Sequence, residues 1–405
     1  MGIFLITIIS FKNYIENYIK LHQITLKLHT KKNRNRYFQM KSTPKSVLLT
    51  STSTIKRVAV EKFFEEKNIN VTITIVNCDD CNLPLQPLHC ATSNVFFFAK
   101  ERMNYAKKMC PSYNSCDYII SIENGIDCFD NFPIDKCFVL IYHRGVLVDG
   151  ISQMKISVPL PEWRDLRTNY QICMYAYNDM IRGYDTTIGE LLAKNNPSID
   201  PKNWMKTLFK VDRNDQIMEA LNKASESLST LLNTQLTLAQ GFSEYDNFPK
   251  EGVLFKDMFP LFSAPRYLKL LIDFIYDMYR FDDIDIIVGL ESRGFLLGVP
   301  LAYKMNRGFV PIRKKGKLPG ETYQESYEKE YGQDTCEIQC NSISQGDKVL
   351  LIDDLIATGG SMQAAVQLVE KCGGIVVDCC VLLNVPQLHD QCNKTLKANY
   401  TVLIQ

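Results

Sequence analysis

Histidine is scarce in this chain of 405 residues: there are five, and two of them, His22 and His29, lie within the first 40 residues. Chemistry in the rest of the chain must therefore depend mainly on carboxylates, lysines, arginines and backbone amides. The sequence also lacks any apolar run near the ~20 residues that a membrane-spanning helix needs. Its 46 basic and 45 acidic residues nearly cancel, so the whole protein has no strong field that would attract nucleic acid or an anionic membrane.

The basic residues are nevertheless concentrated at the N-terminus. Residues 1–40 carry seven lysines and arginines against one acidic residue, Glu16. A secretory signal peptide would have its charges before the apolar stretch, whereas here Ile3 to Ile9 come first. We therefore expect residues 1–40 to be a disordered basic leader, with Met40 as an alternative start. An organelle presequence is the other interpretation.

The 14 cysteines are scattered and not spaced like a disulfide framework. Cys78-Asp-Asp-Cys81 is the single C-x-x-C sequence, and no second pair or nearby histidine completes a zinc site. We expect free thiols in a reducing compartment, and hence a cytoplasmic protein.

Strand-like and helix-like segments alternate from residue 46 to the end of the chain, which predicts an α/β fold. Residues 162–181 and 213–240 have the spacing of helices. The polar stretch Ser225–Ser229 inside the second of these is the expected seam between two α/β domains. The predicted domains span residues 41–225 and 226–405.

The most informative segment is the apolar strand Lys348–Ile352 with the residues that follow it. Asp353 and Asp354 would stand at the carboxyl edge of the sheet, where open α/β sheets bind ligands. The glycines of the next turn let backbone amides approach a phosphate at the start of a helix, where the helix dipole favours an anion. Carboxylates beside such a turn suit the two hydroxyls and the phosphate of a ribose 5-phosphate.

The string from Val349 to Ser361 resembles the 5-phosphoribosyl-1-pyrophosphate (PRPP) signature of the type I phosphoribosyltransferases. Four more blocks resemble adenine phosphoribosyltransferase, in that family's order and at similar spacing: Phe248–Asp257, Gly289–Gly298, Arg313–Gly320 and Tyr327–Gly332. The resemblance covers about residues 240–405. It implies a type I phosphoribosyltransferase fold with a central parallel sheet. It also implies the reaction of adenine with PRPP to give AMP and pyrophosphate, with Mg²⁺ carried on the pyrophosphate.

The resemblance also implies a role for each matching residue. The PRPP-binding residues would be Arg313, Lys314, Lys317, Asp353, Asp354, Ala357, Thr358, Gly359, Gly360 and Ser361, with Lys315 in the same basic cluster. Arg293 would act in catalysis, neutralising the departing pyrophosphate. Adenine would lie against Phe255, with the backbone of Leu254 and Lys256 at its edge. Glu330 would transfer a proton at the purine and Tyr331 would close over the sugar, both on a mobile lid from Leu318 to Gly332. A cis peptide bond between Glu291 and Ser292 and a homodimer are further expectations.

The N-terminal domain resembles the inosine/xanthosine triphosphatase family through the blocks Leu49–Lys56, Leu83–Pro87, Phe98–Arg102, Ser121–Ile126 and Thr187–Leu191. By that match Thr52, Ser53 and Lys56 would hold phosphate, Asp80 would bind Mg²⁺, and Glu123 would be the family's strand-end glutamate. Two departures affect the interpretation. Ser53-Thr54 replaces the family's Asn-Pro pair, and His89-Cys-Ala-Thr92 replaces its acidic pair. Hydrolysis of ITP and XTP and an inactive nucleotide-binding domain therefore both stay open.

Two other functions of the C-terminal domain also stay open. One is a phosphoribosyltransferase that prefers another 6-substituted purine, and the other is a regulator that senses purine or PRPP. Such a regulator would carry a basic helix-turn-helix module, whereas residues 41–405 have an acidic excess and the extra domain is α/β. We therefore expect an enzyme that binds neither nucleic acid nor membrane.

Overall fold

The computed structural model describes residues 43–78, 81, 83, 86–89, 94–127, 133–143, 145–169, 173–175, 181–248, 251–252, 254–329 and 332–404. The predicted leader, residues 1–40, lies outside these ranges. So do three of the predicted site residues: Asp80, Glu330 and Tyr331. Within the described ranges, no helix combines the length and the apolar character that a membrane span requires.

The N-terminal half is built on a mixed sheet with the strand order β2-β1-β4-β3-β9-β8, to which β5, β6 and β7 are added through β4 and β5. Its strands are β1 (Lys45–Leu49), β2 (Val71–Ile75), β3 (Gln86–His89), β4 (Tyr118–Asp127), β5 (Ile134–His143), β6 (Val146–Ile151), β7 (Ile156–Ser157), β8 (Cys173–Tyr175) and β9 (Ile181–Tyr184). Its helices are α2 (Thr54–Glu66), α3 (Asn94–Met109), α4 (Leu160–Asn169), α5 (Ile188–Asn195) and α6 (Trp204–Phe209), with a short 3₁₀ helix, η2 (Tyr113–Ser115). The centre of the sheet is parallel, with β1 pairing β2 and β4.

One helix prediction in this half is wrong. The helix expected over residues 162–181 is α4, which ends at Asn169. Cys173–Tyr175 instead forms β8 and pairs antiparallel with β9. Within α4, Trp163 and Leu166 are buried. The Cys173–Tyr175 run forms backbone hydrogen bonds with β9 at the edge of the sheet, and this pairing outweighs a weak intrinsic preference for helix.

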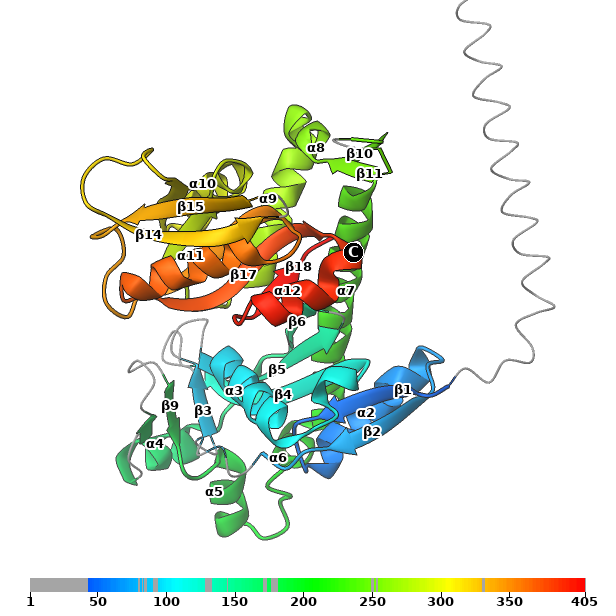
Figure 1. Cartoon of the computed structure of the whole chain (residues 1–405). Coiled ribbons are helices and arrows are strands. Elements are labelled where there is room, and N and C mark those ends of the chain that lie inside the picture. The colour runs from blue at the N-terminus through cyan, green and yellow to red at the C-terminus, as the bar shows by residue number, and fades with distance from the viewer. Residues whose placement is uncertain are drawn as a thin grey trace, which may run out of the picture.

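A single long helix, α7 (Arg213–Ala239), joins the two halves. It begins at Asp212, whose side chain caps the helix by accepting a hydrogen bond from the Asn214 amide, and at 1.5 Å per residue it is about 40 Å long. The Ser225–Ser229 stretch lies within it without a break, and the Ser229 hydroxyl donates to the Ser225 carbonyl one turn earlier (2.9 Å). The predicted domain boundary at 225/226 therefore falls inside α7, which runs along one side of the molecule in Figure 1.

The C-terminal half contains a central sheet with the order β14-β15-β13-β12-β16-β17-β18 and a separate hairpin of β10 and β11. The strands are β10 (Ser243–Asp246), β11 (Leu254–Asp257), β12 (Ile286–Leu290), β13 (Gly308–Lys314), β14 (Thr322–Lys329), β15 (Gly332–Gln339), β16 (Lys348–Ile356), β17 (Ile375–Asn384) and β18 (Tyr400–Val402). The helices are α8 (Phe259–Ser263), α9 (Pro265–Tyr279), α10 (Arg293–Met305), α11 (Gly360–Lys371) and α12 (His389–Thr395), with the 3₁₀ helix η4 (Pro386–Leu388). The five strands from β13 to β18 along this order are parallel, which confirms the predicted central parallel sheet.

Strand β16 is buried on both faces, as a central parallel strand should be. Leu350 and Ile352 belong to the apolar cluster that contains residues of α9 and α10, while Val349 and Leu351 belong to the cluster that contains residues of α11. Helices on both sides of the sheet thus hold β16 in place. Its carboxyl end carries the acidic pair that the sequence singled out.

The two halves share one apolar core, which extends from Val47 in β1 through α7 to Ile404 near the C-terminus. Phe281, just after α9, stacks on Phe96 of α3 with ring centroids 4.1 Å apart. Beside this pair, Lys100 of α3 forms an ion pair with Asp282 (2.5 Å). The halves are therefore joined by side-chain packing as well as by the chain itself.

Candidate active site

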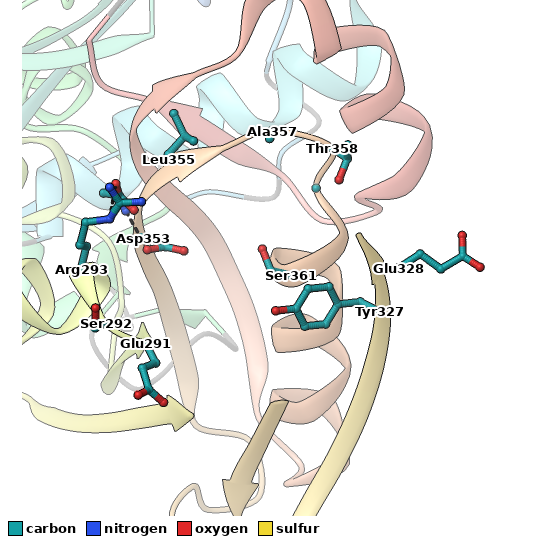
Figure 2. A pocket seen from close by; sticks show the side chains of 12 residues that line it. Glu291, Ser292, Arg293, Tyr327, Glu328, Asp353, Leu355, Ala357, Thr358 and Ser361 are labelled. Atoms are coloured by element: carbon teal, nitrogen blue, oxygen red, sulfur yellow. Dashed lines mark hydrogen bonds and ion pairs between the residues drawn. The ribbon is translucent and has the colours of Figure 1, made fainter. Parts of the chain in front are cut away.

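A cavity of about 450 Å³ opens at the carboxyl ends of β12 and β16 in the C-terminal half. Figure 2 shows the residues around it, which come from the β12–α10 connection, from β14, and from β16 with the start of α11. They are Glu291, Ser292, Arg293, Tyr327, Glu328, Asp353, Asp354, Leu355, Ala357, Thr358, Gly359 and Ser361. The structure thus brings together Arg293, both aspartates and most of the predicted phosphate-binding turn.

The two aspartates have different surroundings. Asp354 is 8% exposed, and its carboxylate forms an ion pair with Nε of Arg293 (2.9 Å). Asp353 is half-buried, and among the residues that the structure describes it has no such cation at ion-pair distance. Burial, followed by the negative charge of Asp354, raises the pKa of Asp353 well above its usual value. The negative charge of Asp354 is therefore compensated by Arg293. The ionised form of Asp353 is disfavoured unless a ligand supplies hydrogen-bond donors to it.

The turn after β16 forms a cradle for an anion at the start of α11. Gly359 is the N-cap of this helix and has a φ of +83°. A Cβ atom there would lie 3.2 Å from Sγ of Cys392, and one on Gly360 would lie 3.2 Å from the carbonyl oxygen of Glu328. The two glycines thus allow a close turn at the start of α11, and Thr358 and Ser361 line the cavity beside it.

The peptide bond between Glu291 and Ser292 is cis, as expected. The Glu291 side chain has a role that the sequence did not reveal: its two carboxylate oxygens accept hydrogen bonds from Nε (3.2 Å) and Nη2 (3.0 Å) of Arg313. The Lys314 amide also donates to it (3.0 Å). The hydrogen bonds from Arg313 hold the pKa of Glu291 below its usual value. Arg313 is therefore fixed against Glu291, whereas Lys314, Lys315 and Lys317 are exposed, and none of these four residues lines the cavity.

The strand β14 contributes Tyr327 and Glu328 to the cavity, two residues that the sequence analysis did not single out. Burial, followed by the charge of Asp334, raises the pKa of Tyr327 to about 12. Both residues belong to the block that also contains Glu330 and Tyr331, so their position in that block was the available signal. The segment expected to be a mobile lid contains β14, which pairs with β15 in a regular antiparallel hairpin from Thr322 opposite Gln339 to Lys329 opposite Gly332.

Comparison with known proteins identifies this half of the chain. Residues 261–399 match a family model described as "Phosphoribosyl transferase domain". The adenine phosphoribosyltransferase of Nitrosomonas europaea is 49% identical over 142 residues, which are 35% of this chain and 82% of that protein. The enzyme of the same name from Neisseria meningitidis serogroup C is 44% identical over 162 residues, 40% of this chain and 85% of its own. The chain belongs to the adenine phosphoribosyltransferase family. A solved adenine phosphoribosyltransferase from Saccharomyces cerevisiae aligns with 43% of this chain and 99% of its own at 42% identity and a TM-score of 0.41.

The predicted adenine-binding residues of this phosphoribosyltransferase lie on β11, apart from the residues that line the cavity. Phe255 packs edge-on against Phe248, with ring centroids 5.0 Å apart. Lys256 forms an ion pair with Glu244 across the hairpin (3.6 Å), and Leu254 is 53% exposed. The structure thus places these three residues together on one hairpin, and their contact with adenine stays a prediction.

The phosphoribosyltransferase chain has a second cavity, of about 290 Å³, in its N-terminal half. Its lining includes Ser53, Lys56 and Glu123 of the predicted nucleotide residues, whereas Thr52 is exposed and outside the lining. Lys56 donates to the Ile122 carbonyl and lies 3.9 Å from the Glu123 carboxylate. Burial lowers the pKa of Lys56. Glu123 also forms an ion pair with Arg102.

A buried charge network beneath this second cavity was not apparent from the sequence. Arg213, at the start of α7, donates two hydrogen bonds to Asp135 (2.5 and 3.2 Å), and both side chains are almost fully buried. Gln216 accepts a hydrogen bond from Arg213 (3.0 Å) and another from Asn124 (3.1 Å). Nothing in the sequence linked these residues, which come from three separate elements, and only the fold brings them together.

Proposed function

We propose that the chain transfers the phosphoribosyl group of PRPP to adenine, with AMP and pyrophosphate as products. The observation that carries this proposal is the C-terminal cavity, where the Asp353–Asp354 pair, the turn from Ala357 to Gly359 and Arg293 surround one space. Asp353 and Asp354 would accept hydrogen bonds from the ribose hydroxyls. The amides at the start of α11 would hold the 5-phosphate, and Arg293 with the exposed lysines of residues 314–317 would neutralise the pyrophosphate.

In this reaction the bond between the anomeric carbon and the pyrophosphate breaks and a bond to the purine nitrogen forms. The protein must therefore stabilise the leaving group, position the base and exclude water. By the family resemblance, Glu330 would move the proton at the purine and Tyr331 would cover the sugar. Phe255, with Leu254 and Lys256, would hold adenine. These assignments extend the proposal to residues outside the cavity.

Mg²⁺ is the proposed cofactor. It prefers oxygen ligands and commonly keeps several waters while binding substrate phosphates and one or two carboxylates. The residues present fit such an ion, because Asp353 is a carboxylate beside the proposed pyrophosphate region. When bound, Mg²⁺ would neutralise charge on the pyrophosphate.

The decisive assay measures nucleotide formation from adenine, hypoxanthine and guanine, each with PRPP and Mg²⁺. Formation of AMP from adenine alone supports the proposal. Preferential use of another 6-substituted purine would instead support the alternative transferase. Binding of PRPP without formation of any nucleotide would support a sensing role and contradict the proposed reaction.

We propose hydrolysis of inosine and xanthosine triphosphates as a second activity, at the N-terminal cavity. Half-buried Lys56 and buried Arg213, together with Lys202, give its lining the cations that a polyphosphate requires. The test is phosphate release from ITP and XTP with Mg²⁺, compared between the wild type and Asp80→Ala. Release by the wild type that is lost in the variant supports hydrolysis. No release above the variant would leave nucleotide binding without hydrolysis, and the proposed activity would be wrong.

We also propose a homodimer in the cytoplasm. Leu296, Val299 and Tyr303 are 43%, 51% and 89% exposed and lie on one face of α10, the helix that begins with Arg293. Eleven cysteines, among them the C-x-x-C pair Cys78 and Cys81, are free thiols, in keeping with a reducing compartment. Light scattering should give twice the chain mass of 46.5 kDa, and Tyr303→Asp should return it to one chain. A monomeric wild type would contradict the dimer.

A further inference from the structure

Glu337 is a buried carboxylate behind the basic turn of the proposed PRPP site, and the sequence analysis gave it no role. It lies on β15, opposite Arg313 of β13 and opposite Gln324 of β14 in the strand register. Its side chain is 2% exposed. A buried carboxylate is costly unless hydrogen bonds or charges compensate it, so its partners indicate what it holds.

Those partners are donors of the turn that follows β13. One carboxylate oxygen accepts hydrogen bonds from the amides of Lys317 (2.8 Å) and Leu318 (2.9 Å). The other accepts from the Thr322 hydroxyl (3.3 Å). Burial acts to raise the pKa of Glu337, but the hydrogen bonds from the amides of Leu318, Gly316 and Lys317 outweigh it and lower the pKa. The carboxylate is therefore ionised at neutral pH and anchors three consecutive amides.

The same turn is held from its other side. Arg313 donates from Nη1 to the Lys317 carbonyl (3.1 Å), while its Nε and Nη2 are bound by Glu291 at the cavity. Glu337 itself has no lysine or arginine at ion-pair distance among the described residues. It therefore fixes the backbone of the turn and leaves the charge of Lys317 available to an anion, while Lys314 lies 3.9 Å from the Asp334 carboxylate.

We propose that Glu337 is a positioning residue for PRPP, holding residues 314–318 in the conformation that binds the pyrophosphate group. The inference rests on the proposed transferase function. Without the carboxylate, the amides of Lys317 and Leu318 lose their acceptor and the turn can rearrange. The lysines of the turn would then no longer converge on the pyrophosphate, while the adenine-binding hairpin at β11 would be unaffected.

The experiment compares the wild type with Glu337→Gln and with the control Glu325→Gln. Glu325 lies on the neighbouring β14 and forms an ion pair with Lys371 (2.5 Å), away from the turn. In Glu337→Gln we expect the PRPP KM and the inhibition constant of pyrophosphate each to rise about tenfold, because the amides then donate to a neutral acceptor instead of a charged one. The adenine KM and kcat should stay within about threefold of the wild type, and the control should match the wild type throughout.

A purely structural role would lower the melting temperature and change all the kinetic constants together, and that result would overturn the inference. An unchanged PRPP KM in Glu337→Gln would also overturn it. If Glu337→Gln does not fold, Glu337→Asp keeps the charge but withdraws the carboxylate from the Lys317 and Leu318 amides by one methylene, and the PRPP KM should rise in it as well. Hydrogen exchange gives an independent readout, since the Lys317 and Leu318 amides should lose protection in the variant; unchanged protection would contradict the proposal. Failure of the proposed function is distinguishable, because the wild type would then form no AMP.

Discussion

The Asp353 side chain combines a ligand-binding position with an unfavourable environment in the free protein. Burial and the neighbouring Asp354 raise its pKa, so its ionised form destabilises the native state. A carboxyl group with a raised native pKa contributes most stability below its unfolded pKa of about 3.9, and that contribution is lost as the pH rises through the native pKa. At neutral pH, the free enzyme therefore loses stability by keeping this group ready for the sugar hydroxyls.

Asp353→Asn should consequently make the protein more stable and less active. We expect a higher melting temperature than the wild type at pH 8, by about 1 °C for each kcal/mol gained in a cooperative unit of this size, with the difference shrinking toward pH 4. The kcat/KM for PRPP should fall by about 10- to 100-fold, because a hydrogen bond to a charged group contributes roughly 1.5–3 kcal/mol. Thermal melts over this pH range and steady-state kinetics check both parts. Asp390→Asn, an exposed change on α12, is the control, and a variant less stable than the wild type at pH 8 would refute the argument.

At the scale of single elements, Gly359 in the turn between β16 and α11 can be compared with Gly346, which lies just before β16. Gly359 and Gly346 have nearly the same backbone conformation, with φ values of +83° and +86°. A Cβ atom on Gly359 would meet Cys392 at 3.2 Å, whereas one on Gly346 would have nothing within 4 Å. Gly359→Ala and Gly346→Ala should therefore both lose about 1–2 kcal/mol of stability from the left-handed conformation.

Only Gly359→Ala should also raise the PRPP KM, by about tenfold, because the proposed phosphate-binding amides must shift to accommodate the methyl group. Denaturant melts and PRPP titrations of both variants separate the two effects. Equal PRPP KM values in the two variants would show that the turn at Gly359 does not bind the phosphate.

The elements of the site were predictable to the extent that they are local in sequence. The acidic pair, the glycine turn and the start of α11 are consecutive, so one string contained them all. Glu291 and Arg313 are 22 residues apart, and Glu337 meets the amides of Lys317 and Leu318 only because β13 and β15 pair. No local pattern encodes such contacts. Likewise, the polar composition of Ser225–Ser229 suggested a domain boundary. Composition alone does not show that this stretch continues α7, where the Ser229 hydroxyl bonds the Ser225 carbonyl.

At the scale of the whole molecule, the shared core implies that the two halves unfold together. The first turns of α7 bury Ile217 and Leu221, and the same helix later buries Leu238. All of these residues belong to the cluster that reaches both sheets. Both tryptophans, Trp163 and Trp204, are buried in the N-terminal half, so tryptophan fluorescence reports on that half alone.

PRPP bound in the C-terminal cavity should therefore raise the melting temperature seen by tryptophan fluorescence in the N-terminal half. A ligand at 100 times its Kd stabilises the state that it binds by about 2.7 kcal/mol, and a cooperative molecule transmits the whole amount. We expect a shift of about 2–5 °C, equal to the shift of a single calorimetric peak. Phe281→Ala removes the ring stacked on Phe96 and should reduce the fluorescence shift relative to the calorimetric one. Asp353→Asn, in which we expect weaker PRPP binding, controls for direct effects of PRPP on the tryptophan fluorescence. Two separate calorimetric peaks with an unshifted tryptophan transition would show that the halves unfold independently.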